Sequence, residues 1–176
     1  MTPFITVSDI QQFKGISSNI NTLKDLIPHI LEAQDFDLRP FMGEGLYLSF
    51  LADFEASPSL VQYDDLFNGC QYTYQGNEYK QEGLKAILIY HAYARFLSNT
   101  GIISTPSGFV QKTNQYSDPV NDKAIARLIQ QARSGATVHE ERVKLYLDRH
   151  ASTYTLWKCA GIQTPYRTGL KIRKIG

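Results

Sequence analysis

Few residues in this sequence have the types and spacing that chemistry requires. The stretch HEERV at 139–143 begins like a zinc-protease helix, in which a second histidine four positions on binds the same metal. Val143 occupies that position here, so we reject a zinc site. The paired acids Asp35 with Asp37, and Asp64-Asp65, have no neighbours that would complete a metal's ligand set. We interpret these acids as solvated carboxylates.

Cofactor motifs are also missing from the sequence. GEGLYL, starting at Gly43, lacks both the third glycine and the preceding strand of a dinucleotide-binding fingerprint. No phosphate-binding loop and no GxSxG nucleophile elbow occurs. His91, His139 and His150 fall on apolar helical faces, and we interpret each as a hydrogen-bonded packing residue. We therefore predict no enzymatic activity, no cofactor and no metal.

Length and composition are those of one folded domain. The chain has 176 residues, and its two cysteines, Cys70 and Cys159, form no CxxC pair, so we expect free thiols. No signal peptide is recognisable and no run of about 18 apolar residues could span a bilayer. We expect a protein without membrane contact that is made and folded in a cytoplasm.

Charge is divided unevenly along the chain, although the net charge is only +1. Residues 1–82 hold 12 acidic and 4 basic residues, whereas residues 83–176 hold 5 acidic and 14 basic residues. Complementary patches of this kind can steer association between molecules. The alternative is that the fold interleaves the two halves within one molecule.

Helical periodicity covers most of the chain. Apolar spacing predicts helices over 23–41, 46–56, 60–67, 84–98 and about 119–150. Pro28 either kinks the first of these or lies in the first turn of a helix that begins near Leu26. Gly135 on the apolar stripe of the last helix predicts a kink or a close helix crossing.

The helix at 84–98 is apolar on nearly every side, so it must be buried. We expect it to lie between the long helix of its own chain and a neighbouring subunit. Before it, Tyr72 and Tyr74 alternate with polar residues up to a Gly76-Asn77 pair, and this pattern predicts a hairpin with a type II′ turn. After it, IIS and GFVQKT are expected to be short extended pieces around residues 106–108.

Together these elements predict a mainly α fold. We expect a helical bundle with a long helix in the C-terminal half, a small β-hairpin and an extended C-terminal tail. The bundle forms one domain over residues 1–160. Residues 161–176 form the basic tail, in which apolar and basic residues alternate as in a strand.

The order of four segments resembles that of small head-tail connector proteins of tailed phages and prophages of Bacteroidetes-type hosts. These segments are ITVSDI, then DLIPHILEAQDFDLRPFMGEGLY, then GLKAILIYHAYARFLSNTGIISTPSGFVQKT, and a long final helix ending in YLDRHASTYTLW. The resemblance covers most of the chain. It implies a structural virion protein, made in the host bacterial cytoplasm and placed in the neck between head and tail.

The same resemblance implies the partners. They are the portal protein, copies of the chain in a ring of roughly a dozen, a downstream neck or tail protein, and genomic DNA that passes through the lumen without sequence-specific binding. The tail of related connectors commonly reaches the portal, which makes its residues portal-contact candidates: Tyr166, Arg167, Lys171, Ile172, Arg173 and Lys174. Extended segments offer edges to neighbouring subunits, and their interface candidates are Tyr72, Tyr74, Tyr79, Phe109, Val110 and Lys112.

Two alternatives remain open. A stopper or tail-completion protein lies one level further down the same neck, and sequence does not separate the levels. A small DNA-binding or packaging accessory protein would explain the basic half, but it would concentrate its bases on one helix face. In this sequence many of the bases are in the tail and the loops.

Overall fold

Helices make up most of this computed structural model. The described residues are 2–16, 26–56, 60–99, 102–105, 108–111 and 122–157. The helices are α1 Val7–Phe13, α2 Ile27–Ala33, the π-helix η2 Gln34–Leu38, α3 Arg39–Met42, α4 Glu44–Glu55, α5 Val61–Asn68, α6 Gly83–Asn99 and α7 Asp122–Arg149. The strands are β1 Cys70–Tyr74, β2 Asn77–Gln81, β3 Ile102–Thr105 and β4 Gly108–Gln111.

The fold class predicted from the sequence is confirmed: a mainly α bundle with a long helix in the C-terminal half and a small hairpin. The extended pieces around residues 106–108 also form a second hairpin, because β3 pairs with β4 in antiparallel fashion. The predicted extended tail, residues 161–176, lies outside the described residues. Among the described helices, none is both long and apolar enough to cross a bilayer.

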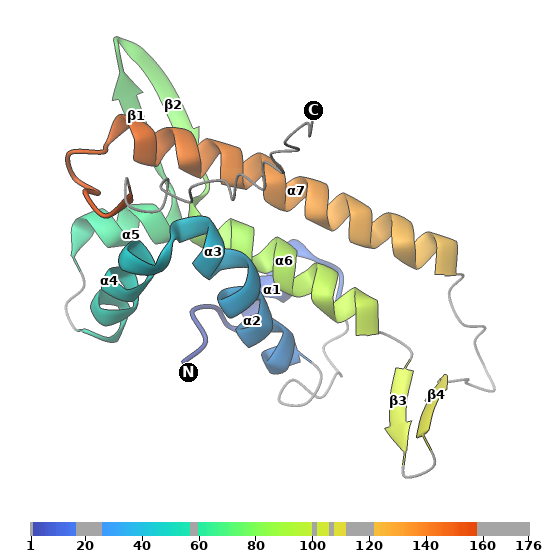
Figure 1. The fold of residues 1–176 in the computed structure, drawn as a ribbon. Coiled ribbons are helices and arrows are strands. Elements are labelled where there is room, and N and C mark those ends of the chain that lie inside the picture. The colour runs from blue at the N-terminus through green and yellow to red at the C-terminus, as the bar shows by residue number, and fades with distance from the viewer. Residues whose placement is uncertain are drawn as a thin grey trace, which may run out of the picture.

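Helix α6 is the centre of the bundle. Its residues Leu84, Ile87, Leu88 and Ala92 are fully buried. Helices α1, α2, α5 and α7 and the π-helix η2 pack around it, and α7 runs alongside it and extends beyond it (Figure 1). The chain's own helices therefore supply most of the cover that this helix needs, and additional cover by a neighbouring subunit stays a prediction.

Helices α6 and α7 cross closely at a glycine. A side chain at Gly135 would overlap the ring of Tyr90, so the absence of a Cβ lets the ring lie directly against the α7 backbone. The ring is held in place from other sides by the Lys14 ammonium, 3.7 Å from its centroid, and by His139, 5.2 Å away. Of the two sequence alternatives for Gly135, the close crossing is correct.

Two prolines shape the segment from α2 to α3. Pro28 lies in the first turn of α2, where its missing N–H costs little, as one alternative predicted. Pro40 cannot donate a hydrogen bond four residues back. In the turn just before it, the Arg39 N–H donates to the Gln34 carbonyl, five residues back. The resulting π-helix keeps the Gln34 side chain fully buried, where it accepts from the Phe4 N–H at 3.1 Å.

The β1–β2 hairpin differs from its prediction in turn type. The register pairs Tyr74 with Asn77, so the turn residues are Gln75 and Gly76 rather than Gly76 and Asn77. Both have positive φ, 50° and 79°, which defines a type I′ turn instead of type II′. At its base, the buried Gln81 side chain donates to the Asp65 carbonyl at 2.8 Å and thereby ties the hairpin to α5.

Candidate functional site

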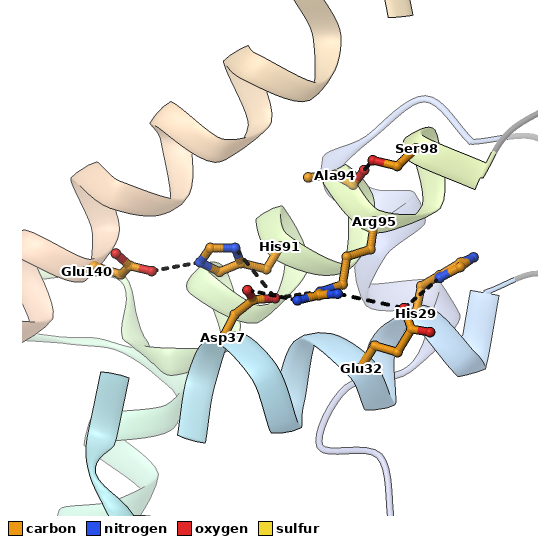
Figure 2. A network of polar contacts seen from close by, with 8 residues as sticks. All are labelled: His29, Glu32, Asp37, His91, Ala94, Arg95, Ser98 and Glu140. Carbon is orange, nitrogen blue, oxygen red and sulfur yellow. Dashed lines mark hydrogen bonds and ion pairs between the residues drawn. The ribbon is translucent and has the colours of Figure 1, made fainter. Parts of the chain in front are cut away.

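A polar network connects three parts of the helical body (Figure 2). Arg95 of α6 donates two hydrogen bonds to the Asp37 carboxylate of η2, at 2.7 and 3.1 Å. His91, one turn earlier on α6, places Nε2 2.7 Å from Glu140 of α7 and Nδ1 3.8 Å from Asp37. The network therefore joins η2, α6 and α7 through side chains that are largely withdrawn from solvent.

The same network continues along α2. The Arg95 guanidinium lies 3.8 Å from Glu32, which also meets His29 at 3.3 Å. The hydrogen bond to Asp37 raises the pKa of Arg95, so the guanidinium stays charged at any pH that the fold survives. A permanently charged group with fixed partners suits a structural link better than proton transfer.

A second cluster joins the end of β2 to α7. Glu82 accepts from Arg142 at 2.8 Å and lies 3.3 Å from His139. Burial disfavours the charged carboxylate, but the hydrogen bonds and charges of Arg142 and His139 outweigh burial and lower the pKa of Glu82. A similar pair links Asp9 of α1 to Lys85 of α6 at 2.6 Å.

The ion pairs in these clusters join the acidic half of the chain to the basic half. Each of the ion pairs Asp9–Lys85, Asp37–Arg95 and Glu82–Arg142 joins an acid from residues 1–82 to a base from residues 83–176. The fold thus interleaves the acidic and basic halves within one molecule, which is the second of the two sequence alternatives. The interpretation of Asp37 as a solvated carboxylate is wrong, because only 21% of its side chain is exposed and it is bound by Arg95.

The histidine interpretations fit the structure. His91 and His139 contact Glu140 and Glu82 as described, and the His150 Nδ1 lies 2.8 Å from the Tyr146 carbonyl. Within the described residues, no three His, Cys, Asp or Glu side chains are grouped closely enough to hold a metal ion.

The tyrosine face of the β1–β2 hairpin surrounds an arginine from α7. The Arg149 guanidinium lies 3.8 Å from the ring centroid of Tyr79 and 4.8 Å from that of Tyr74. It also donates a hydrogen bond to the Tyr72 hydroxyl at 3.0 Å. Three residues predicted to meet a neighbouring subunit are thus engaged with their own chain on one face of the hairpin, and their role in an interface stays a prediction.

Two further tyrosines, Tyr146 and Tyr154, support this hairpin. Tyr72 packs edge-on against Tyr146, at 5.0 Å between centroids, and the Tyr146 hydroxyl lies 3.2 Å from that of Tyr154. Burial raises the pKa of Tyr146, and it raises that of Tyr154 to about 12. The Tyr154 hydroxyl donates to the Gln62 carbonyl at 2.6 Å, so both phenols are neutral structural groups.

The remaining predicted site residues fall in two places. Phe109 and Val110 belong to β4, where they pair with Ser104 and Ile103 of β3. The others lie outside the described residues: Lys112, Tyr166, Arg167, Lys171, Ile172, Arg173 and Lys174.

An open groove of about 750 Å3 lies beside the base of the β1–β2 hairpin. The end of α1, the end of α5, the hairpin base, the first turns of α6 and one residue of α7 line it. Its apolar part is formed by Ala86 and Ile89 of α6, with the ring of Phe13 at its rim. The sequence did not reveal this groove, because residues from three stretches that are far apart in the sequence, 12–13, 68–90 and 139, line it.

Comparison with known proteins gives a family but no function. Residues 38–167 match a family of unknown function, DUF6712. The chain belongs to this family. The matched range includes His91, Arg95 and Glu140 of the polar network, the β1–β2 hairpin and Arg149, and it begins one residue after Asp37. No curated protein and no solved structure matches the chain.

The sequence did not predict which acidic residues would contact His91 and Arg95. Asp37 and Glu140 lie 58 and 49 residues from their partners on α6, so no local pattern pairs them. One signal was available: a charged Arg95 inside a nearly all-apolar helix must have an acidic partner when that helix is buried.

Proposed function

We propose that this protein is an adaptor ring subunit of a tailed phage, which docks on the portal vertex and links the head to the tail. One observation carries the proposal beyond the sequence resemblance. The helical body is internally cross-linked, and both of its hairpins pair only with themselves among the described residues, which leaves their outer strand edges open (Figure 1). Open edges are where strands of other chains add to a sheet.

The proposed partners follow the resemblance. Copies of the chain form the ring, and the basic tail residues Arg167, Lys171, Arg173 and Lys174 contact the portal. A downstream neck or tail protein binds the opposite side of the ring, and the genome passes through the lumen. Such a protein works in the neck of the virion and needs no catalytic residue.

The internal ion pairs favour this function over DNA binding. Lys85, Arg95 and Arg142 each contact a carboxylate of the same chain. A base that is already paired adds little to phosphate binding, which depends on uncompensated positive charge. A DNA-binding accessory protein is therefore the less supported alternative, and a stopper one level below the adaptor stays open.

Co-sedimentation with the portal protein of the same genome tests the proposal. We expect the full chain to sediment with portal rings at physiological salt, and a chain lacking residues 166–176 to lose most of this binding. Unchanged binding of the shortened chain would contradict the role of the tail. If the full chain does not sediment with the portal but binds duplex DNA with a steep salt dependence, the result would support the DNA-binding accessory protein instead.

A further inference from the structure

We propose that copies of this protein associate head to tail by inserting a knob at the start of α5 into the groove beside the β1–β2 hairpin of the next copy. The knob consists of Leu60, Val61 and Asp64. This inference deepens the proposed ring and rests on it, because it names the two surfaces that would join neighbouring subunits.

The groove offers an apolar floor and one uncommitted positive charge. Ala86 and Ile89 form the floor but are only 8% and 1% exposed, so the accessible apolar surface comes mainly from Phe13 at the rim, which is 61% exposed. Of the charged residues that line the groove, Glu82 is bound by Arg142 and Lys85 by Asp9. Lys80 is exposed and makes no ion pair with the described residues. The groove therefore suits an apolar side chain that is accompanied by a carboxylate.

The knob has this chemistry. Val61 is 77% exposed and Leu60 is 55% exposed, which makes them two consecutive apolar residues in water. Asp64 follows Val61 by three residues, so it lies on the same side of the helix one turn later. The Leu60 N–H donates to the Asp53 carboxylate at 2.9 Å, which fixes the start of the helix and presents the knob in one orientation.

The apolar part of the knob is separated from the groove of its own molecule. Asn68 and Gly69 line the groove at the end of α5, and Asn68 donates a hydrogen bond to Asp64 at 2.7 Å, whereas Leu60 and Val61 lie at the beginning of the helix. An eight-residue helix is about 12 Å long, so its length separates Leu60 and Val61 from the groove of the same copy. Contact between unlike surfaces on two copies is heterologous, and it repeats until it closes into a ring or continues as a filament.

Variants that damage one surface at a time test the contact. Val61→Asp places a charge on the knob, and Lys80→Glu gives the groove the same sign as Asp64. Both sites are exposed, so circular dichroism should show an unchanged fold. We expect each variant to weaken self-association at least about tenfold in sedimentation equilibrium. The control is Val138→Asp on α7, at a valine that is 46% exposed and belongs to neither surface, and it should associate like the natural chain.

Mixing and charge exchange distinguish this contact from any other. In a mixture of the two variants, the intact knob of Lys80→Glu fits the intact groove of Val61→Asp, so dimers form and growth stops there. A chain that carries both Asp64→Lys and Lys80→Glu should regain association. The proposal is overturned if the mixture forms no dimers, if the exchange restores nothing, or if the natural chain stays monomeric at about 1 mM.

These outcomes are separate from those of the proposed function. Association that follows the knob and groove variants, in a chain that does not bind the portal, would overturn the adaptor function alone. Portal-bound rings that form equally well with Val61→Asp and Lys80→Glu would overturn the knob and groove alone.

Discussion

At the scale of single residues, the side chains with the most polar partners connect elements of the fold. Asp37 binds Arg95 through both carboxylate oxygens and lies 3.8 Å from His91. Removing one member of such a shielded group leaves the others without a partner in a site with little water. The consequences should appear in stability.

Asp37→Asn should lower the free energy of unfolding by about 1–3 kcal/mol, because the amide keeps the shape but not the charge that Arg95 requires. Urea denaturation followed by circular dichroism measures the change. The matched control is Asp35→Asn, whose carboxylate is 37% exposed and should contribute less than about 1 kcal/mol. Equal losses in the two variants would contradict the structural role of the network.

Gly135→Ala should destabilise the protein although alanine favours helices. Helix propensity alone would stabilise α7 by about 1 kcal/mol, whereas overlap with Tyr90 costs about 1–3 kcal/mol. We therefore expect a net loss in thermal unfolding. In a Tyr90→Leu background the same glycine substitution should become neutral or stabilising, and a persistent loss there would show that the ring is not the cause.

At the scale of elements, Arg149 holds the β1–β2 hairpin against the end of α7. A two-stranded hairpin is marginal by itself, so its order depends on what it packs against. The guanidinium covers the tyrosine rings and donates to Tyr72, while Gln81 anchors the hairpin base to α5. The hairpin is thereby held at two points of the body.

Arg149→Ala should therefore loosen the hairpin more than the bundle. We expect faster amide hydrogen exchange over residues 70–81, with little change in α6, since the core helices do not depend on this contact. Lys144→Ala, an exposed change on the same helix, serves as control. Exchange that rises equally in α6 and in the hairpin would mean that Arg149 supports the whole body.

Helices and strands could be predicted where the spacing of apolar residues specifies them locally. The apolar spacing of residues 84–98 identified α6, whereas Gly135 predicted either a kink or a close crossing, and the structure shows the close crossing. The turn type was wrong because Gln75 takes a positive φ that is uncommon for residues other than glycine. The π-helix before Pro40 was not predicted, because a hydrogen bond to the fifth instead of the fourth preceding residue leaves no periodic signal over five residues.

At the scale of the whole molecule, folding brings the acidic and basic halves together. Three ion pairs, Asp9–Lys85, Asp37–Arg95 and Glu82–Arg142, connect α1, η2 and the residue after β2 to α6 and α7. Charge counts could show that the halves differ, but only the tertiary contacts determine that they compensate each other. The candidate groove depends in the same way on elements that are far apart in sequence.

Acid should weaken the fold through these carboxylates. The pKa of Asp9 and of Glu82 is lowered in the folded state, because contacts with Lys85 and with Arg142 and His139 outweigh burial. Their stabilisation is present above the unfolded pKa values of about 4 and is lost as the pH falls through the lower folded values. Glu82→Gln should therefore flatten the decline of the melting temperature below about pH 5. An unchanged slope would contradict the assignment.

Electron microscopy of portal particles mixed with the purified protein tests the proposed adaptor ring. We expect a ring coaxial with the portal, with one tail per subunit reaching its surface and an open lumen. Portal particles that remain bare at saturating protein concentration would contradict it.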